Sequence, residues 1–364
     1  MRPGGATLPD FPWDSLAEVK ATAAAHPGGI VDLSVGTPVD PVPEAIRAAL
    51  ASVSDIPGYP ATHGTPELRA AAVGALRRRH GVEGVEPDAV LPTIGSKELV
   101  AWLPRLLGVG PGDTVVIPEL SYPTYEVGAL LAGASVLRAD SLFALGPQRP
   151  AMVWLNSPSN PTGRVLGVDH LRKVVDWARQ RDVVIVADEC YLALGWEAEP
   201  ASILHPSVCD GDMRNLLAVH SLSKSANLAS YRAGFITGDP RLVADLLEVR
   251  KHAGMIVPRP VQEAMTVALA DDAALTGQRE RYARRRLVLQ KALQDNGFRI
   301  DHSEAGLYLW ASRGEDAWRT LGWLAGRGIL VAPGTFYGPR GAQHVRVALT
   351  GTDERVEAAA ERLA

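Results

Sequence analysis

Short, continuously hydrophobic runs alternate with amphipathic stretches through the middle of the chain. A run such as Val183–Ala187 is typical of a strand that is buried on both faces of a parallel sheet. Between these runs, hydrophobic residues recur at spacings of three and four, which predicts helices. Because strands and helices alternate, we expect an α/β fold in which helices flank a mostly parallel sheet. The predicted strands span residues 89–93, 114–118, 152–155, 183–187 and 216–219, and the helices between them span 96–107, 124–132 and 168–180.

The pattern differs at both ends of the chain. After Asp239 and Pro240 it changes to successive helices and then to short strands interleaved with helices, which predicts a smaller α+β domain. The N-terminal helix is expected to join that domain. We therefore predict a large domain over 36–245 and a discontinuous small domain over 1–35 with 246–364. The elements predicted outside the central region are helices over 14–26, 43–54, 66–81, 241–253, 259–271, 276–296, 316–327 and 353–363 and strands over 30–35, 298–301, 307–311, 329–331 and 345–349.

The overall charge argues against a nucleic-acid-binding protein. The 364 residues carry a net charge of -4, and the arginine clusters at 77–79 and 284–286 lie on helical patterns, where we expect solvated faces. No apolar run approaches the ~20 residues that span a bilayer, and Met1–Asp10 lacks the pattern of a signal peptide. Two cysteines, Cys190 and Cys209, suit a reducing compartment and lack the spacing of metal ligands. We therefore expect a cytoplasmic protein with no nucleic-acid or membrane partner and no metal.

The candidate chemistry centres on the stretch from Ser221 to Arg232, which follows a predicted strand. Only six of the 37 basic residues are lysines, and Lys224 is the one outside the predicted helices. A nearby cation and partial desolvation both lower the pKa of a lysine and make it nucleophilic toward carbonyls. Ser221, Ser223 and Arg232 also suit the oxygens of a phosphate. A carbonyl-reactive lysine beside a phosphate site suggests pyridoxal phosphate as cofactor, although an ordinary loop lysine can have the same local sequence.

Polar residues also follow the other predicted strands, at the edge where open α/β sheets bind ligands. Gly95, Ser96 and Lys97 begin a helix whose free N–H groups can bind phosphate, although a helix capped by Ser96 has the same sequence. Tyr122 can stack on a flat ring or be an exposed loop tyrosine. Asn160 lies in a turn-rich loop, and its amide can bond a phenolate oxygen and a carboxylate.

Two charged residues are predicted to be buried. Asp188 directly follows the strand Val183–Ala187, and a carboxylate at that depth needs a cation, which a protonated pyridine nitrogen supplies. Such a pair keeps the ring an electron sink. Arg346 lies between Val345 and Val347 in a short apolar strand. It can hold a substrate carboxylate with two bonds or form a structural salt bridge.

Taken in order, these motifs resemble those of the class I/II aminotransferases, pyridoxal-phosphate enzymes of fold type I related to aspartate aminotransferase. The resemblance runs from Gly36 to Arg346 and implies a homodimer. It also implies that Lys224 bonds covalently to the cofactor and that Asp188 pairs with its pyridine nitrogen; with Tyr191, these are the catalytic residues. The other implied contacts are Tyr122 with the ring; Asn160 and Tyr191 with the phenolic oxygen; Ser96, Lys97 (through its backbone), Ser221, Ser223 and Arg232 with the phosphate; Tyr59 with the phosphate in the neighbouring subunit; and Arg346, assisted by Asn160 and the backbone of Gly36, with the substrate α-carboxylate.

Within this family the sequence is most similar to the actinobacterial N-succinyldiaminopimelate aminotransferases. The similar segments are Leu33–Pro43, Leu91–Glu98, Asp188–Trp196 and Met255–Pro258. This similarity implies transfer between glutamate and the keto acid that yields N-succinyl-LL-2,6-diaminopimelate, in the biosynthesis of lysine and cell-wall precursors. The alternatives are acetylornithine or aspartate specificity, a β-lyase on the same fold, or a cofactor-binding regulatory module. Lys97, Arg164 and Arg259 are the candidates for binding a distal carboxylate.

Overall fold

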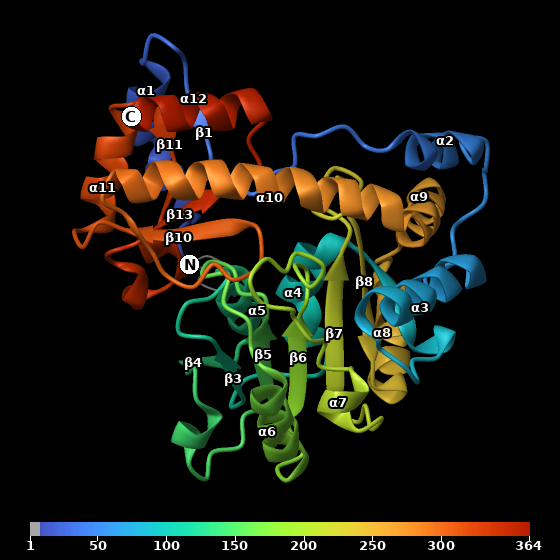
Figure 1. The fold of residues 1–364 in the computed structure, drawn as a ribbon. Coiled ribbons are helices and arrows are strands. Elements are labelled where there is room, and N and C mark those ends of the chain that lie inside the picture. The colour runs from blue at the N-terminus through green and yellow to red at the C-terminus, as the bar shows by residue number, and fades with distance from the viewer. Residues whose placement is uncertain (1–7) are drawn as a thin grey trace, which may run out of the picture.

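The computed structural model describes residues 8–364, which form a seven-stranded sheet, a four-stranded sheet and a two-stranded pair (Figure 1). Residues 1–7, which belong to the predicted small domain and to the segment predicted to lack a signal peptide, lie outside this range. The α/β class with a mostly parallel sheet is confirmed.

The seven-stranded sheet has the strand order β2-β8-β7-β6-β5-β3-β4. Every neighbouring pair is parallel except the two pairs that β8 makes with β2 and β7. The sequence pattern did not predict β4 or β8, because β4 is half-exposed and β8 contains two glycines that weaken a strand pattern. The strands are β2 (Val90–Ile94), β3 (Thr114–Ile117), β4 (Ser135–Arg138), β5 (Met152–Asn156), β6 (Val184–Asp188), β7 (Leu216–Ser221) and β8 (Ala233–Gly238).

Helices cover both faces of this sheet, as Figure 1 shows. Alternate residues of β5 belong to different hydrophobic clusters: Trp154 packs with residues of α4, α5 and α8, whereas Val153 packs with residues of α3, α6, α7 and α9. This alternation follows from the two-residue period of a strand. The helices of the first face are α4 (Gly95–Leu106), α5 (Thr124–Ala132) and α8 (Pro240–Ala253), and those of the second are α3 (Pro66–His80), α6 (Val168–Arg179), α7 (Pro206–Cys209) and α9 (Arg259–Ala270).

The four-stranded sheet is antiparallel, with the order β12-β13-β10-β9. Near it, β1 pairs in parallel with β11, which brings the N-terminal residues against the C-terminal third of the chain. The predicted division of the chain into two domains agrees with this pairing and stays a prediction. The elements here are α1 (Ala17–Ala24), β1 (Val31–Asp32), α10 (Asp272–Asp295), β9 (Arg299–Ile300), β10 (Tyr308–Ser312), α11 (Ala317–Ala325), β11 (Ile329–Leu330), β12 (Ala332–Pro333), β13 (Val345–Ala348) and α12 (Asp353–Leu363), and the remaining helices are α2 (Glu44–Ser52) and short 3-10 turns over Pro12–Leu16, Pro87–Ala89, Leu142–Leu145, Gly334–Tyr337 and Pro339–Gly341.

The prediction of a solvated arginine cluster over 284–286 is wrong for two of its three residues. Arg285 and Arg286 are buried on the inner face of α10. Arg285 donates two hydrogen bonds to Asp40, of 2.8 and 2.6 Å, and one of 2.6 Å to Asp353. Because α10 carries polar residues on both faces, its pattern could not reveal that one face has buried partners.

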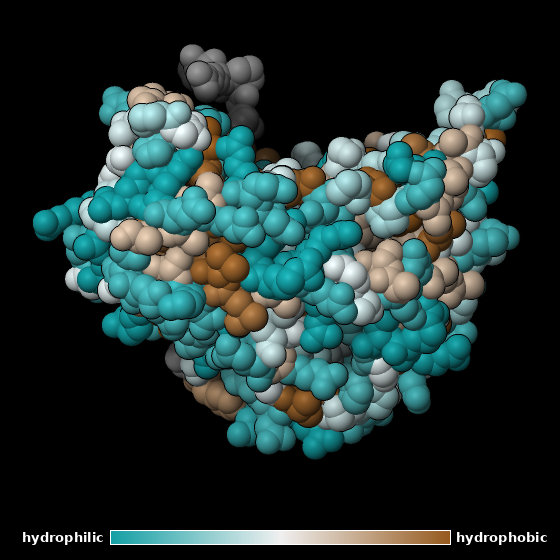
Figure 2. All heavy atoms as spheres, turned by 45° about the horizontal axis from the view of Figure 1, so that its top comes forward, coloured by the Kyte–Doolittle hydropathy of each residue, from teal (hydrophilic) through white to brown (hydrophobic). Residues whose placement is uncertain are grey.

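The face of the molecule that Figure 2 shows is largely hydrophilic, and the hydrophobic residues on it lie in small, separate groups. Within residues 8–364, no helix combines the length and apolar character needed to cross a membrane.

Candidate active site

The carboxyl ends of β2, β3, β5, β6 and β7 lie along one edge of the seven-stranded sheet, because these strands run in the same direction. The antiparallel strand β8 begins at this edge, immediately after Arg232. The fold therefore brings together the segments that the sequence singled out. They are Gly95–Lys97, Tyr122, Asn160, Asp188–Tyr191, Ser221–Lys224 and Arg232.

Asp188 is the last residue of β6, and its carboxylate is buried. Its Oδ2 accepts a hydrogen bond of 2.6 Å from the hydroxyl of Tyr125, and its Oδ1 accepts one of 3.2 Å from the backbone N–H of Cys190. Burial raises the pKa of Asp188, and within residues 8–364 no cationic side chain offsets that effect. The carboxylate therefore has the surroundings expected of a group that receives a cation from a ligand.

Tyr125 is a site residue that the sequence analysis missed. Its ring is fully buried and stacks on Trp154, with the ring centroids 4.7 Å apart. Tyr122, which was predicted to face the cofactor, meets the Tyr125 ring edge-on at 5.8 Å. A signal was present, because a tyrosine on the buried face of α5 needs a hydrogen-bond partner and Asp188 is a buried acceptor.

Removing the Tyr125 hydroxyl should weaken cofactor binding. Tyr125→Phe keeps the stacked ring but leaves Oδ2 of Asp188 with one donor fewer. Since a hydrogen bond to a charged group contributes about 1.5–3 kcal/mol, we expect the Kd for pyridoxal phosphate to rise about 10- to 100-fold. Fluorescence titration of the apoprotein measures this, with Tyr231→Phe as a matched loss of a phenol that makes no side-chain hydrogen bond among the described residues. Equal Kd values for Tyr125→Phe and the unmodified protein would exclude this contribution.

Lys224 lies in the turn after β7. Its Nζ donates a hydrogen bond to the carbonyl oxygen of Gly36, and its own carbonyl accepts one of 3.3 Å from Tyr282 of α10. Burial first, and then the positive charges of Arg346 and Arg232, lower the pKa of Lys224 to about 8. This direction agrees with the expectation from the sequence, and it makes the amine a usable nucleophile near neutral pH.

The edge near Lys224 carries further positively charged groups. Gly95, the first residue of α4, has a left-handed φ of 71°, and a Cβ there would overlap Nη2 of Arg232. Ser223 is buried, and its N–H donates a hydrogen bond of 3.2 Å to Oγ of Ser221. Burial and the nearby Arg232 lower the pKa of Lys97. The free N–H groups at the start of α4, with the guanidinium of Arg232 beside them, suit a phosphate group.

Arg346 is buried on β13. Its Nη1 donates a hydrogen bond of 2.8 Å to Oδ1 of Asn160, and its Nη2 donates one of 2.7 Å to the carbonyl oxygen of Ser34. Burial by itself lowers its pKa, but the phenols around it, led by Tyr308 and Tyr337, raise the pKa overall. Within residues 8–364 no carboxylate pairs with it, so the structural salt bridge considered from the sequence is not found there.

The remaining predicted residues have distinct positions. Gly36 is buried, and Tyr191 is buried with its Oη 3.1 Å from Oη of Tyr308. Tyr59 is fully exposed in the loop between α2 and α3. Its predicted contact with a neighbouring subunit, and the homodimer itself, stay predictions.

Comparison with known proteins decides the family. The sequence profile described as aminotransferase class I and II matches residues 29–363. The chain belongs to this family. Its fold is therefore fold type I and its cofactor is pyridoxal phosphate, as the resemblance implied.

Two relatives share most of their sequence with this aminotransferase. A protein of Mycobacterium tuberculosis described as a probable aminotransferase is 68% identical over 98% of this chain and 86% of its own length. The 4-dedimethylamino-4-oxo-anhydrotetracycline transaminase OxyQ of Streptomyces rimosus is 58% identical over 98% of this chain and 99% of its own length. Among solved structures, the probable N-succinyldiaminopimelate aminotransferase of Thermus thermophilus is 29% identical, with a TM-score of 0.87 over 97% of this chain and 99% of its own.

Proposed function

We propose that this aminotransferase exchanges an amino group between glutamate and a keto acid that carries a second, distal carboxylate, of the type that yields N-succinyl-LL-2,6-diaminopimelate. The names of several relatives support this substrate class. One is the probable N-succinyldiaminopimelate aminotransferase of Thermus thermophilus described above. Others are the LL-diaminopimelate aminotransferases, of which that of Aquifex aeolicus is 31% identical over 98% of this chain and 96% of its own length. The observation that carries the proposal is the position of Lys97.

The residues at the sheet edge have the chemistry that amino transfer needs. Pyridoxal phosphate, when bound, supplies a ring that stabilises negative charge developing at the substrate Cα. Asp188 holds the cation of that ring in place, and Arg232 holds the phosphate together with the free N–H groups at the start of α4. Nζ of Lys224 takes a proton from the substrate Cα and returns it, for which a pKa of about 8 is well suited. Arg346, fixed by Asn160, presents its guanidinium to the α-carboxylate.

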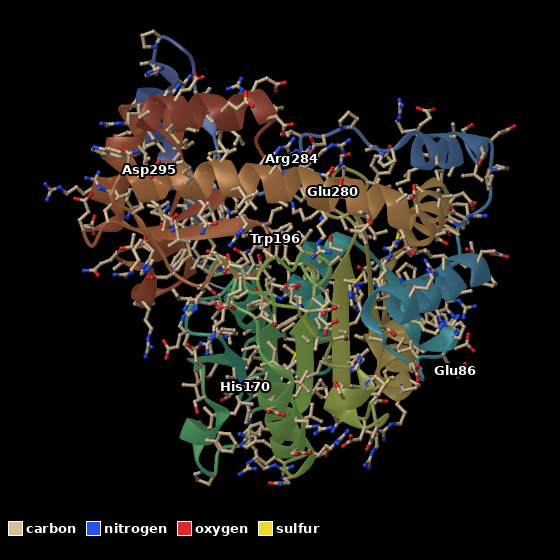
Figure 3. All side chains as sticks on the ribbon, in the orientation of Figure 1. Glu86, His170, Trp196, Glu280, Arg284 and Asp295 are labelled. Carbon is tan, nitrogen blue, oxygen red and sulfur yellow. The ribbon has the colours of Figure 1, made fainter. Side chains whose placement is uncertain are left out.

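Of the three cations considered for the distal carboxylate, Lys97 is the best placed. Its Nζ lies 5.3 Å from the centroid of the Phe11 ring, beside Arg232, and forms no salt bridge with a described carboxylate. Arg259 is already paired with Glu263 at 2.8 Å. Arg164 instead lines a separate cavity of about 150 Å³. His170 of α6, which is labelled in Figure 3, lines the same cavity.

A comparison of substrates with and without a distal carboxylate tests this proposal. For N-succinyl-LL-2,6-diaminopimelate we expect Lys97→Met to lower kcat/KM about 10- to 100-fold, because one charge-assisted hydrogen bond is lost. For norleucine, which has no distal carboxylate, kcat/KM should change little. Arg259→Met is the matched control and should preserve the ratio between the two substrates. Equal losses for both substrates in Lys97→Met would assign Lys97 to the cofactor instead.

A second candidate function follows from the 58% identity to OxyQ, whose name describes transfer to a polycyclic ketone. That ketone has no distal carboxylate of the diaminopimelate type. Steady-state assays of both acceptors with glutamate as donor separate the two candidates. The β-lyase alternative needs a separate assay, because a lyase releases pyruvate and ammonia from an amino acid that carries a leaving group on Cβ, without any keto acid.

A further inference from the structure

We infer that Tyr308 is a positioning residue that links the substrate-binding arginine to the tyrosine beside the cofactor. The inference rests on the proposed function, specifically on the roles given above to Arg346 and Tyr191. Neither the sequence motifs nor the family resemblance assigned a role to Tyr308. It is 4% exposed and touches three separate parts of the site.

The ring of Tyr308 acts on Arg346. In the pairing of β10 with β13, Tyr308 lies opposite Ala348, so it shares a face of the sheet with Arg346 two residues away. Cζ of the guanidinium lies 3.9 Å from the centroid of the Tyr308 ring and 4.9 Å from that of Tyr337. Both distances are within the range of a cation–π interaction. The two rings restrict the guanidinium to the orientation in which it bonds Asn160.

The hydroxyl of Tyr308 acts on a different partner. Its Oη lies 3.1 Å from Oη of Tyr191, and the two rings are nearly perpendicular, at 73°. When Tyr308 donates this hydrogen bond, the proton of Tyr191 is free to be donated to the phenolic oxygen of the cofactor. Hydrogen bonds in such a chain polarise one another, so this arrangement strengthens Tyr191 as a donor.

The same hydroxyl also packs against the backbone of Gly36. A Cβ at Gly36 would overlap Oη of Tyr308, and the carbonyl oxygen of Gly36 accepts the hydrogen bond from Lys224. Tyr308 therefore contacts Arg346, Tyr191 and Gly36, the residue to which Lys224 donates its hydrogen bond. The titratable groups around it are Tyr122, Tyr191, Tyr282, Tyr337 and Arg346.

Two substitutions separate the ring from the hydroxyl. Tyr308→Phe keeps the stacking on Arg346 and removes the bond to Tyr191. A hydrogen bond donated to the phenolic oxygen favours the more negative form, so weakening it should move the pH midpoint of the cofactor's visible absorbance upward by about half to one pH unit. The KM for amino acids should stay within about twofold. Tyr308→Leu removes the ring as well, and we expect it to raise KM a further 2- to 30-fold, roughly the range of a cation–π contact.

Single variants of the partners distinguish a failure of this inference from a failure of the proposed function. If Tyr191→Phe leaves the absorbance midpoint unchanged, the role proposed for Tyr191 is wrong. If Tyr191→Phe moves the midpoint but Tyr308→Phe does not, or if the double variant moves it further than Tyr191→Phe alone, the coupling through Tyr308 is overturned. Tyr231→Phe should match the unmodified enzyme in both readouts. Thermal unfolding checks that each variant is folded; Tyr308→Met, which also lacks an aromatic face, replaces Tyr308→Leu if the latter does not fold.

Discussion

Lys224→Ala is expected to lower kcat for amino transfer by at least ~10⁴-fold. In the proposed mechanism the side chain bonds the cofactor and also moves the proton at the substrate Cα, and positioned acid–base catalysis alone contributes ~10²–10⁴-fold. The variant should stay folded, because Nζ makes a single hydrogen bond, to Gly36, and lies in surroundings that disfavour its charge. Formation of 2-oxoglutarate from glutamate measures the loss, and the visible absorbance of covalently bound pyridoxal phosphate should disappear with it.

Titration of the Lys224 amine also predicts a pH dependence for the unmodified protein. Because only the unprotonated amine attacks a carbonyl, covalent binding of pyridoxal phosphate to the apoprotein should increase with pH. Its midpoint should lie at about 8 rather than at 10.5, the ordinary value for a lysine. Lys291→Ala is the matched control, because that lysine is exposed and, among the described residues, pairs with Asp295 alone. Asp295, at the end of α10, is labelled in Figure 3. Turnover that persists in Lys224→Ala would remove this residue from the mechanism.

Arg346→Ala is expected to lower kcat/KM for amino acids about 10²- to 10³-fold. Breaking a buried ion pair by removing one partner costs about 3–5 kcal/mol, because the other charge remains buried without compensation. In the proposed function that charge is the α-carboxylate of the substrate, and Oδ1 of Asn160 also loses its donor. The loss should appear mainly in KM, and Arg346→Lys should recover part of it by restoring the charge without the two-pronged geometry.

Steady-state kinetics with a series of amino acids measures the effect of Arg346→Ala. Arg299→Ala provides the control, since its side chain is 68% exposed and pairs with Asp301. An Arg346→Ala enzyme with an unchanged substrate profile would show that a different residue binds the α-carboxylate.

The local sequence patterns predicted most elements within a few residues of their observed ends. Pro66 and Gly81 bound α3 as expected, because a proline fits the first helical position and Gly81 takes the left-handed conformation that ends the helix. Strand β8 was not predicted, because its glycines carry little pattern of their own. Its place between the edge strand β2 and β7 is decided by pairing with both of them.

For the site, the sequence was informative about which residues carry chemistry and less so about what surrounds them. Asp188, Asn160 and Lys224 were predicted because each follows an apolar strand, and parallel strands end at a common edge. Tyr125 was missed because its partner is 63 residues away in the chain. Tyr308 was missed for the same reason, since its partner Tyr191 is 117 residues away.

The sequence by itself determined the α/β fold, the sheet edge at which the candidate site residues meet, and the lysine, serine and arginine motif from which we inferred pyridoxal phosphate. These depend on residue periods and turn residues that act over a few positions. Only the tertiary structure decided which donor reaches Asp188, that Arg346 lies between two tyrosines without a described carboxylate, and that Arg285 is buried. Those properties depend on contacts between distant segments, because a buried charge or phenol must find its partner wherever the packed fold places one.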